Sequence, residues 1–210
     1  MCYILLMKKI LCFGDSNTYG FNPKDCSRYD ENIRWTGILQ KLSKGRYEII
    51  EAGCNNRNCF AKNPMAEEMN GNVMLPQYLE LKPDIVVLAL GINDLQKSYN
   101  PSEVEIENGI KYLIDMTKET LPKSKIIVMA PAKLSDNVLS GMFAFQFDKT
   151  SIEKSHKIQE IYKKVAKETS VNFFNLDEIV VTSKEDGLHF TEEAHSTIAH
   201  KLHDFICNID

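Results

Sequence analysis

Two groups of residues, far apart in the sequence, carry side chains that could act together in nucleophilic chemistry. Ser16 follows Gly14, which permits a sharp turn, and Asp186 and His189 stand three positions apart near the other end of the chain. A serine hydroxyl is a weak nucleophile at neutral pH, so it needs an imidazole to accept its proton and a carboxylate to hold that imidazole in the correct tautomer. The pattern predicts Ser16 as nucleophile, His189 as base and Asp186 as its orienting acid.

Each of these residues also has a plain structural interpretation. Serine is a common helix N-cap, so Ser16 taken alone could simply begin a helix. His189 taken alone could be a surface histidine beside the start of the last helix. The catalytic interpretation is favoured because both groups fall at the edge of the predicted sheet where ligands bind.

A third group, the Gly-Ile-Asn-Asp segment at 91–94, could stabilise the negative charge that develops in acyl transfer. Fixed hydrogen-bond donors do this, each contributing on the order of a hundred- to a thousand-fold in rate. The side-chain amide of Asn93 is one candidate donor, and the backbone N–H groups of Ser16 and Gly53 are the other two. The alternative is a turn that merely ends a strand, for which Gly, Asn and Asp are the usual residues.

The elements that must position these groups alternate along the chain between strand and helix. Segments rich in β-branched and aliphatic residues predict strands at 10–13, 47–52, 85–90, 125–130 and 171–175. Apolar residues recur at helical spacing over 35–42, 102–120, 151–169 and 191–206. Because the strands are apolar throughout, a parallel sheet covered on both faces is expected, which is a three-layer α/β/α sandwich. Ligands bind at the carboxyl ends of such strands, where the candidate groups lie.

Length and composition indicate one globular domain over residues 1–210, with residues 1–7 as an extension before the first strand or Met7 as an alternative start. The chain has 43% hydrophobic and 26% charged residues. Its formal net charge of -4 argues against a nucleic-acid partner and against an anionic membrane surface. No apolar run approaches the roughly 18 to 20 residues that span a bilayer. A small-molecule substrate is therefore expected, with no nucleic acid and no membrane as partner.

Cysteine usage and the first residues point to a cytoplasmic protein. The six cysteines include no CxxC pair, which argues against a disulfide framework and against a zinc site. The apolar stretch at 2–7 is followed, not preceded, by lysines, and no small-residue cleavage site comes after it, so a signal peptide is not predicted.

Together, the three groups and Gly53 resemble, in order and spacing, the four sequence blocks of the SGNH (GDSL) hydrolases. The likeness extends from near residue 8 to near residue 205. Within that family, the segments 10–16, 18–20 and 34–37, with Arg57, are most similar to the small bacterial arylesterases and acyltransferases. The resemblance implies a flavodoxin-like five-stranded parallel sheet, no metal and no organic cofactor. It also implies hydrolysis of short-chain esters, with acyl transfer to alcohols as a further activity.

By this resemblance, Ser16, Asp186 and His189 form the triad, and Ser16, Gly53 and Asn93 form the oxyanion hole. The sequence departs from the subgroup at Asn17, at Tyr19 and in the Cys-Asn-Asn segment at 54–56, which makes the mouth of the pocket more polar.

The predicted substrate contacts are Asn17, Cys54, Phe143 and Phe145. The last two belong to the segment 131–150, the longest without clear periodicity, in which phenylalanines alternate. This segment is expected to form a wall of the pocket or a contact in a homo-oligomer, with an ordinary core edge as the alternative.

Two other functions remain open from the sequence. One is a carbohydrate or other polar-substrate O-deacetylase that uses the same triad. The other is a non-catalytic flavodoxin-like module that binds FMN or a phosphorylated ligand, although the segment 14–20 lacks a Gly-rich or Ser/Thr-rich phosphate loop.

Several further polar residues are assigned no chemistry. Asp15 and Asp94 are expected to support their loops through hydrogen bonds. The histidines of the last predicted helix, His195, His200 and His203, are expected on a solvated face and not at a metal.

Overall fold

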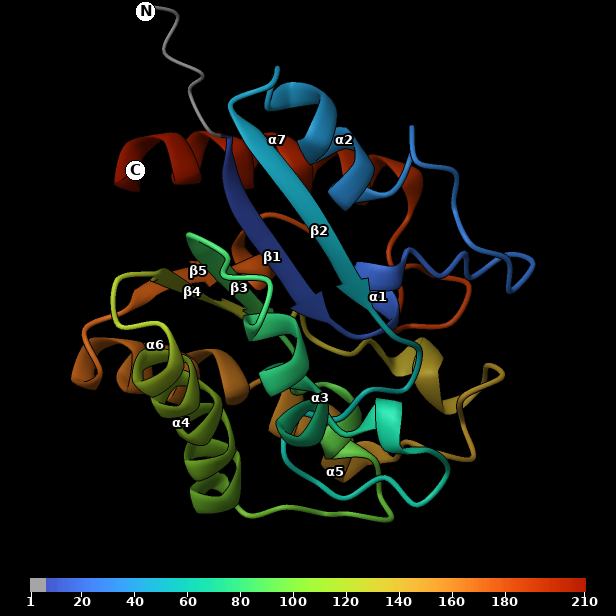
Figure 1. Ribbon diagram of the computed structural model, residues 1–210. Helices are drawn as coiled ribbons and strands as arrows, with labels where there is room; N and C mark the ends of the chain where they lie inside the picture. Colours follow the sequence, from blue (N-terminus) through green and yellow to red (C-terminus); the bar gives the residue numbers. More distant parts are fainter. Residues whose placement is uncertain (1–6) are drawn as a thin grey trace, which may run out of the picture.

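A five-stranded parallel sheet forms the centre of the molecule in the computed structural model, which describes residues 7–210 (Figure 1). The predicted extension at 1–7 lies, apart from Met7, outside the described residues. The strand order is β2-β1-β3-β4-β5, and every neighbouring pair is parallel. The predicted α/β fold is thereby confirmed. The strands are β1 Lys8–Gly14, β2 Tyr47–Gly53, β3 Ile85–Ala89, β4 Lys125–Ala130 and β5 Asn172–Asn175.

Helices cover both faces of this sheet (Figure 1). Helices α2 and α7 pack together on one face, and α3, α4 and α6 cover the other. The helices are α1 Ser16–Tyr19, α2 Trp35–Leu42, α3 Gly71–Leu79, α4 Glu103–Thr120, α5 Lys149–Ser155, α6 Ile158–Glu168 and α7 Glu192–Ile209. Short 3-10 turns lie at η1 Glu67–Met69, η2 Asn93–Leu95, η3 Asp136–Leu139 and η4 Leu176–Glu178.

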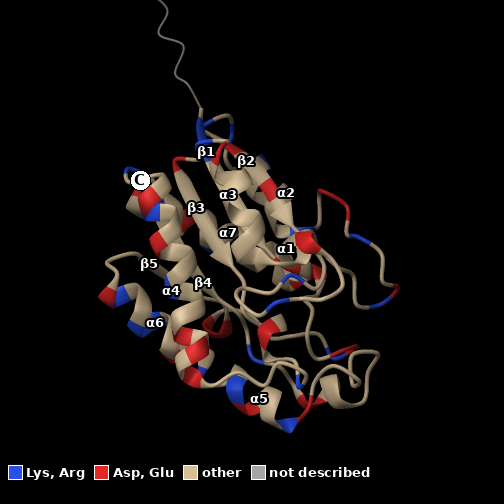
Figure 2. Cartoon of the chain, turned by 60° about the horizontal axis from the view of Figure 1, so that its bottom comes forward, with Lys and Arg blue, Asp and Glu red and all other residues tan. Residues whose placement is uncertain are grey.

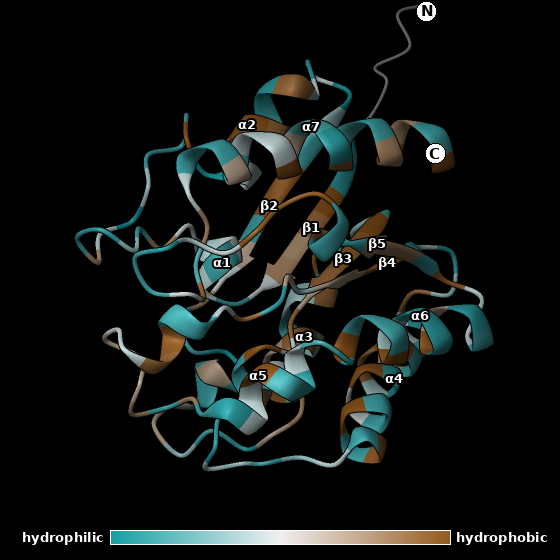
Figure 3. Cartoon of the chain, turned by 180° about the vertical axis from the view of Figure 1, so that it is seen from behind, coloured by the Kyte–Doolittle hydropathy of each residue, from teal (hydrophilic) through white to brown (hydrophobic). Residues whose placement is uncertain are grey.

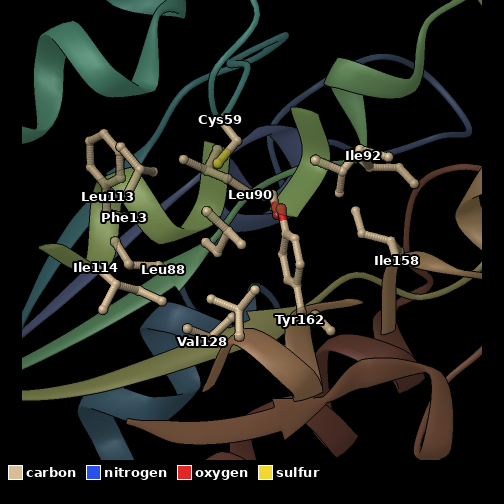
Figure 4. Packing of buried hydrophobic residues seen from close by; sticks show 14 of the residues in the cluster. Phe13, Cys59, Leu88, Leu90, Ile92, Leu113, Ile114, Val128, Ile158 and Tyr162 are labelled. Atoms are coloured by element: carbon tan, nitrogen blue, oxygen red, sulfur yellow. The ribbon is translucent and has the colours of Figure 1, made fainter. Parts of the chain in front are cut away.

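The core consists of two apolar clusters separated by the sheet. Along β1, Ile10 and Cys12 belong to the cluster under α2 and α7, whereas Leu11 and Phe13 belong to the cluster under α3 and α4. This alternation explains why the strand is apolar at each position from Ile10 to Phe13, since both of its faces are buried there. Figure 4 shows the second cluster, in which the Tyr162 hydroxyl donates a hydrogen bond to the carbonyl oxygen of Leu90 (3.1 Å).

The surface of the described residues is polar and carries both signs of charge. Seen from behind, the middle of the sheet is largely hydrophobic and the outward sides of the helices are largely hydrophilic (Figure 3). Acidic and basic residues lie side by side on α5 and α6 (Figure 2). Within residues 7–210, no helix combines the length and the hydrophobicity needed to cross a bilayer.

The two largest differences from the predicted elements concern the helix expected over 151–169 and the stretch between β2 and β3. The single helix expected over 151–169 is two helices, because the backbone N–H of His156 closes α5 on the carbonyl groups of Ile152 and Glu153. The stretch between β2 and β3, to which no element was assigned, contains η1 and α3. Pro76 lies inside α3, and an internal proline is an unfavourable signal for a helix.

Candidate active site

Three side chains from the two ends of the sequence form a continuous hydrogen-bonded chain at the carboxyl edge of the sheet. Ser16 begins α1, and its Oγ lies 2.8 Å from His189 Nε2. His189 Nδ1 lies 2.6 Å from Asp186 Oδ2. All three residues are at most 4% exposed. With the imidazole proton on Nδ1, His189 donates to the carboxylate and accepts from the serine hydroxyl.

The short spacing between Asp186 and His189 is closed by a tight turn. Asp186 Oδ1 accepts hydrogen bonds from the backbone N–H groups of Leu188 (3.0 Å) and His189 (2.9 Å). Gly187, which directly follows Asp186, has a φ of 71°. This geometry leaves Asp186 Oδ2 free for the imidazole. Burial alone would raise the pKa of Asp186, but the hydrogen bonds from His189 and Leu188 hold it below its ordinary value. The acid therefore stays ionised at neutral pH.

The N-cap of α1 is Asp15 and not Ser16. The Asp15 carboxylate accepts the backbone N–H of Asn17 (2.9 Å), which leaves the Ser16 hydroxyl for His189. Gly14 is needed here, because a Cβ at this position would lie 2.0 Å from Thr18 Oγ1. Burial raises the pKa of Asp15 to about 7. The expected supporting role of Asp15 agrees with these contacts.

A cavity of about 180 Å³ opens beside the nucleophile. Its size suits a small acyl group, since pockets for drug-sized ligands are typically about 300–1,000 Å³. A larger hollow of about 640 Å³ near η4 contains none of the three triad side chains. The small cavity is lined by Ser16, Phe21, Asn55, Asn56, Met65, Asn93, Phe143, Gln146, Leu188 and His189.

Two of the three predicted oxyanion donors are at this cavity, but Gly53 is not. Cys54 N–H donates to Gly14 O (3.1 Å), and because alternate residues of a strand face opposite sides, the N–H of Gly53 points away from β1. The absence of a side chain at Gly53 serves packing instead, since a Cβ there would lie 2.1 Å from Tyr19 N.

Asn56, three residues further along the chain, lines the cavity where Gly53 was expected to contribute. Its backbone adopts a φ of 60°. The predicted side-chain donor, Asn93 Nδ2, uses one hydrogen for the carbonyl oxygen of Arg57 (3.1 Å). Because an amide group has two N–H bonds, its second hydrogen remains available.

The four predicted substrate contacts lie in very different places. Phe143 lines the cavity with its ring centroid 5.2 Å from that of His189. Phe145 is 68% exposed and does not line the cavity. Cys54 does not line it either. Asn17 turns toward the triad loop, where its Nδ2 donates to Leu188 O (3.3 Å).

Several lining residues escaped sequence reasoning. The Phe21 ring stacks on His189 with centroids 4.3 Å apart, and Met65 and Gln146 come from loops without a recognisable pattern. The Cys-Asn-Asn segment at 54–56 was the one available signal, because it departs from the subgroup that the sequence resembles.

Asp94 supports the neighbouring loop as expected. Its carboxylate accepts the backbone N–H groups of Cys59 (2.6 Å), Phe60 (2.9 Å) and Ala61 (2.8 Å). Complete burial raises the pKa of Asp94 to about 6.

The expectation for the histidines of the last helix is wrong at one position. His195 is fully buried, and its Nδ1 accepts the backbone N–H of Trp35 (3.3 Å), whereas His200 is exposed. Across residues 7–210, no group of three or more His, Cys, Asp or Glu side chains is arranged to hold a metal.

Comparison with known proteins agrees with this geometry. The sequence pattern of the GDSL-like lipase/acylhydrolase family matches residues 12–196. A carbohydrate acetylesterase from Sinorhizobium meliloti is similar at a TM-score of 0.87 and 31% identity, over 97% of this chain and 100% of that one. The aryl esterase of M. smegmatis is similar at a TM-score of 0.88 and 28% identity, over 96% and 99%. Comparison with functionally curated proteins returns no significant match.

The family pattern extends over most of the sequence, and the structural likeness covers almost the whole of each chain. The chain belongs to the GDSL-like lipase/acylhydrolase family and is a carboxylic ester hydrolase.

Proposed function

We propose that the chain hydrolyses short-chain carboxylic esters through a covalent acyl-enzyme on Ser16. The observation that carries this proposal is the hydrogen-bonded chain from Ser16 through His189 to Asp186, beside a cavity of about 180 Å³.

His189 Nε2 accepts the proton of the Ser16 hydroxyl as Oγ attacks the ester carbonyl carbon. The tetrahedral intermediate collapses, and the imidazolium gives its proton to the departing alcohol. Water, deprotonated by the same imidazole, then attacks the carbonyl carbon of the acyl-enzyme. The second tetrahedral intermediate collapses, the bond from carbon to Ser16 Oγ breaks, and the imidazolium returns its proton to Oγ as the carboxylic acid is released. Asp186 stabilises the imidazolium that forms in each step.

The oxyanion formed in both steps needs donors at the cavity. We assign this role to the backbone N–H groups of Ser16 and Asn56 and to the side-chain amide of Asn93. All three residues line the cavity, and Asn56 replaces the predicted Gly53 for the reasons given above.

The aromatic wall supports a preference for short acyl groups. Phe21 and Phe143 both lie against the His189 ring and line the cavity, which leaves limited room beyond the serine. An alcohol in place of water would turn the same intermediate toward acyl transfer, and this remains a proposal. Cytoplasmic location and a homo-oligomer also remain predictions.

A second candidate is O-deacetylation of a polar substrate such as an acetylated sugar. The amide side chains of Asn55, Asn56 and Gln146 at the cavity favour it, because they can bind hydroxyl groups. The similar protein from S. meliloti is described as a carbohydrate acetylesterase. The third alternative, a non-catalytic binding module, is set aside because the chain is an ester hydrolase.

The test is hydrolysis of p-nitrophenyl acetate by the wild type beside Ser16→Ala, together with labelling by a fluorophosphonate. We expect both activity and labelling to be lost in the variant, because the nucleophile is removed. A variant that keeps its activity would contradict the proposal. Release of acetate from acetylated sugars at a higher kcat/KM than from p-nitrophenyl acetate would favour the second candidate.

A further inference from the structure

Side-chain hydrogen bonds join the loops that carry two of the three assigned oxyanion donors, Asn56 and Asn93. Asn93 and Asp94 hold the backbone of residues 57–61 through the contacts described above. Gln96, just after η2, adds a third contact, because its Nε2 donates to Asn56 Oδ1 at 2.7 Å. The turn after β3 therefore holds the loop after β2 at several points.

Gln96 acts from outside the cavity. It is only 6% exposed and is not among the residues that line the cavity. Its backbone N–H donates to Asn93 O (3.3 Å), so Gln96 also contacts Asn93, another assigned oxyanion donor. A buried amide in this position has no direct access to substrate, so any effect on the reaction must pass through its partners.

Two oxygen atoms of Asn56 accept hydrogen bonds, while its backbone N–H makes none with the described part of the protein. Gln96 donates to its side-chain oxygen, and Asn63 Nδ2 donates to its backbone oxygen (3.0 Å). Within residues 7–210, the backbone N–H of Asn56 has no hydrogen-bond partner in the protein. This is the arrangement expected of an N–H that is reserved for a charge formed during the reaction.

The backbone of Asn56 also needs such support. Its φ of 60° lies in the left-handed region, which asparagine tolerates better than most residues but which remains less favourable than the right-handed region. A peptide group in this region can turn its N–H away from the cavity unless contacts hold it.

We propose that Gln96 is a positioning residue that fixes the oxyanion donor Asn56 through the hydrogen bond between their side chains. The inference rests on the proposed serine esterase mechanism. It predicts that Gln96 influences the stabilisation of the transition state and has little influence on substrate binding.

The first experiment compares Gln96→Met with the wild type on p-nitrophenyl acetate. Methionine keeps the length of the side chain and removes the donor. Complete loss of an oxyanion donor lowers kcat by about a hundred- to a thousand-fold. For a donor that is displaced but still present, we expect a loss in kcat of about ten- to a hundred-fold, with KM changed by less than about threefold. Phosphonylation of Ser16 should slow in parallel, and Lys97→Met, at the exposed next residue, should behave as wild type.

A double-mutant cycle with Asn56→Gly identifies the route of the effect. Glycine keeps the backbone N–H and adopts positive φ readily, but it removes the oxygen that Gln96 binds. In that background we expect Gln96→Met to change kcat by less than about threefold, since the partner is gone. An equal loss in both backgrounds would overturn the proposal, as would full activity of Gln96→Met.

Folding and function are separated by two controls. Thermal melting identifies a variant that does not fold. If Gln96→Met fails to fold, Gln96→Glu replaces it in the comparison with the wild type and in the double-mutant cycle. Glutamate keeps the polarity and length of the side chain but places an oxygen opposite Asn56 Oδ1. A wild type without esterase activity would refute the proposed function itself. An active wild type whose Gln96 variants are also fully active would refute only this inference.

Discussion

The proposed reactivity of Ser16 depends on groups that its neighbours in the sequence do not provide. His189 reaches it from the far end of the chain, and Phe21 and Phe143 cover the imidazole on the cavity side. Asp186 fixes the ring from behind. Each of these side chains has a separate task that substitution can isolate.

Asp186→Asn should lower kcat/KM by about a thousand- to ten-thousand-fold. An asparagine side chain does not hold the Nδ1–H tautomer and does not stabilise the imidazolium. The measurement is steady-state hydrolysis of p-nitrophenyl acetate. Glu185→Gln, at the exposed preceding residue, is the matched control and should retain wild-type activity. A loss of less than tenfold in Asp186→Asn would contradict the assigned role.

Phe143→Ala should widen the acyl preference, because it removes a ring from the wall of a small cavity. We expect kcat/KM for p-nitrophenyl hexanoate, relative to the acetate, to rise by about tenfold, which is a typical effect of added apolar room. Phe145→Ala is the control, since that side chain is 68% exposed and outside the cavity. Equal changes in both variants, or none in either, would refute the assignment of this wall.

The packing of α7 against α2 relies on a buried histidine between the two helices. The N-cap of α2, Arg34, makes no side-chain capping bond, and His195 Nδ1 accepts the N–H of Trp35, the first residue of α2. A helix end leaves such N–H groups unsatisfied unless a partner is supplied. Burial, and to a lesser degree the neighbouring His189, lowers the pKa of His195 to about 3.

This contact predicts loss of stability in acid. Between pH 6.5 and about 3 the unfolded chain binds a proton at His195 that the folded protein excludes, so the free energy of unfolding falls with falling pH. The contribution approaches about 1.4 kcal/mol per pH unit. In His195→Asn, whose side-chain oxygen can still accept the Trp35 N–H, denaturant unfolding at pH 6.5 and 4.5 should show a smaller difference.

Two comparisons separate the effect of His195 from those of other titrating groups. The raised pKa values of Asp15 and Asp94 act in the opposite sense, since they favour the folded state as pH falls, but they are common to wild type and variant. His200→Asn, on the exposed face of α7, is the control and should keep the wild-type difference. The same pH difference in His195→Asn and wild type would refute the buried neutral histidine.

The molecule as a whole is tied together at the amino end of the sheet, opposite the active site. Asp210 follows α7, and its nearly buried carboxylate accepts hydrogen bonds from Lys8 of β1 (2.7 Å), Tyr47 of β2 (2.9 Å) and Arg46 (3.1 Å). Lys125 of β4 bonds the backbone oxygens of residues 209 and 210. Burial opposes ionisation of Asp210, but the hydrogen bond from Lys8 and those that follow lower its pKa to about 2.

Asp210→Asn should therefore lower the free energy of unfolding by roughly 1–2 kcal/mol at pH 7, a range set by charged hydrogen bonds whose partners are partly exposed. Because the folded pKa lies below the ordinary value, this stabilisation is present above about pH 4 and is lost as pH falls toward 2. Urea unfolding measures the change. Asp204→Asn, at an exposed position on the same helix, should cost less than about 0.5 kcal/mol. Equal losses in the two variants would contradict the stabilising role proposed for the Asp210 carboxylate.

The order of strands and helices and the approximate positions of the triad were accessible from the sequence, because they depend on local patterns. Apolar runs without alternation require a sheet covered on both faces, and the residues that follow its strands must share one edge. Ser16 and Asn93 were predicted in this way, whereas Asp186 and His189 were predicted from their spacing before the last helix. Helix α3 was missed because Pro76 hides its pattern.

The direction in which each backbone N–H group and side chain points, in contrast, was decided by the tertiary structure. Gly53 ends β2 and Asn56 lies three residues beyond it. The hydrogen bonding between β1 and β2 turns the N–H of Gly53 away from β1, whereas Asn56 has a positive φ and lines the cavity. Phe143 and Phe145 have the same local character, but they face the cavity and the solvent respectively. The sequence by itself determined which residue types stand at the active edge. Only the folded chain decided which of their atoms point inward, because that direction depends on contacts between segments far apart in the sequence.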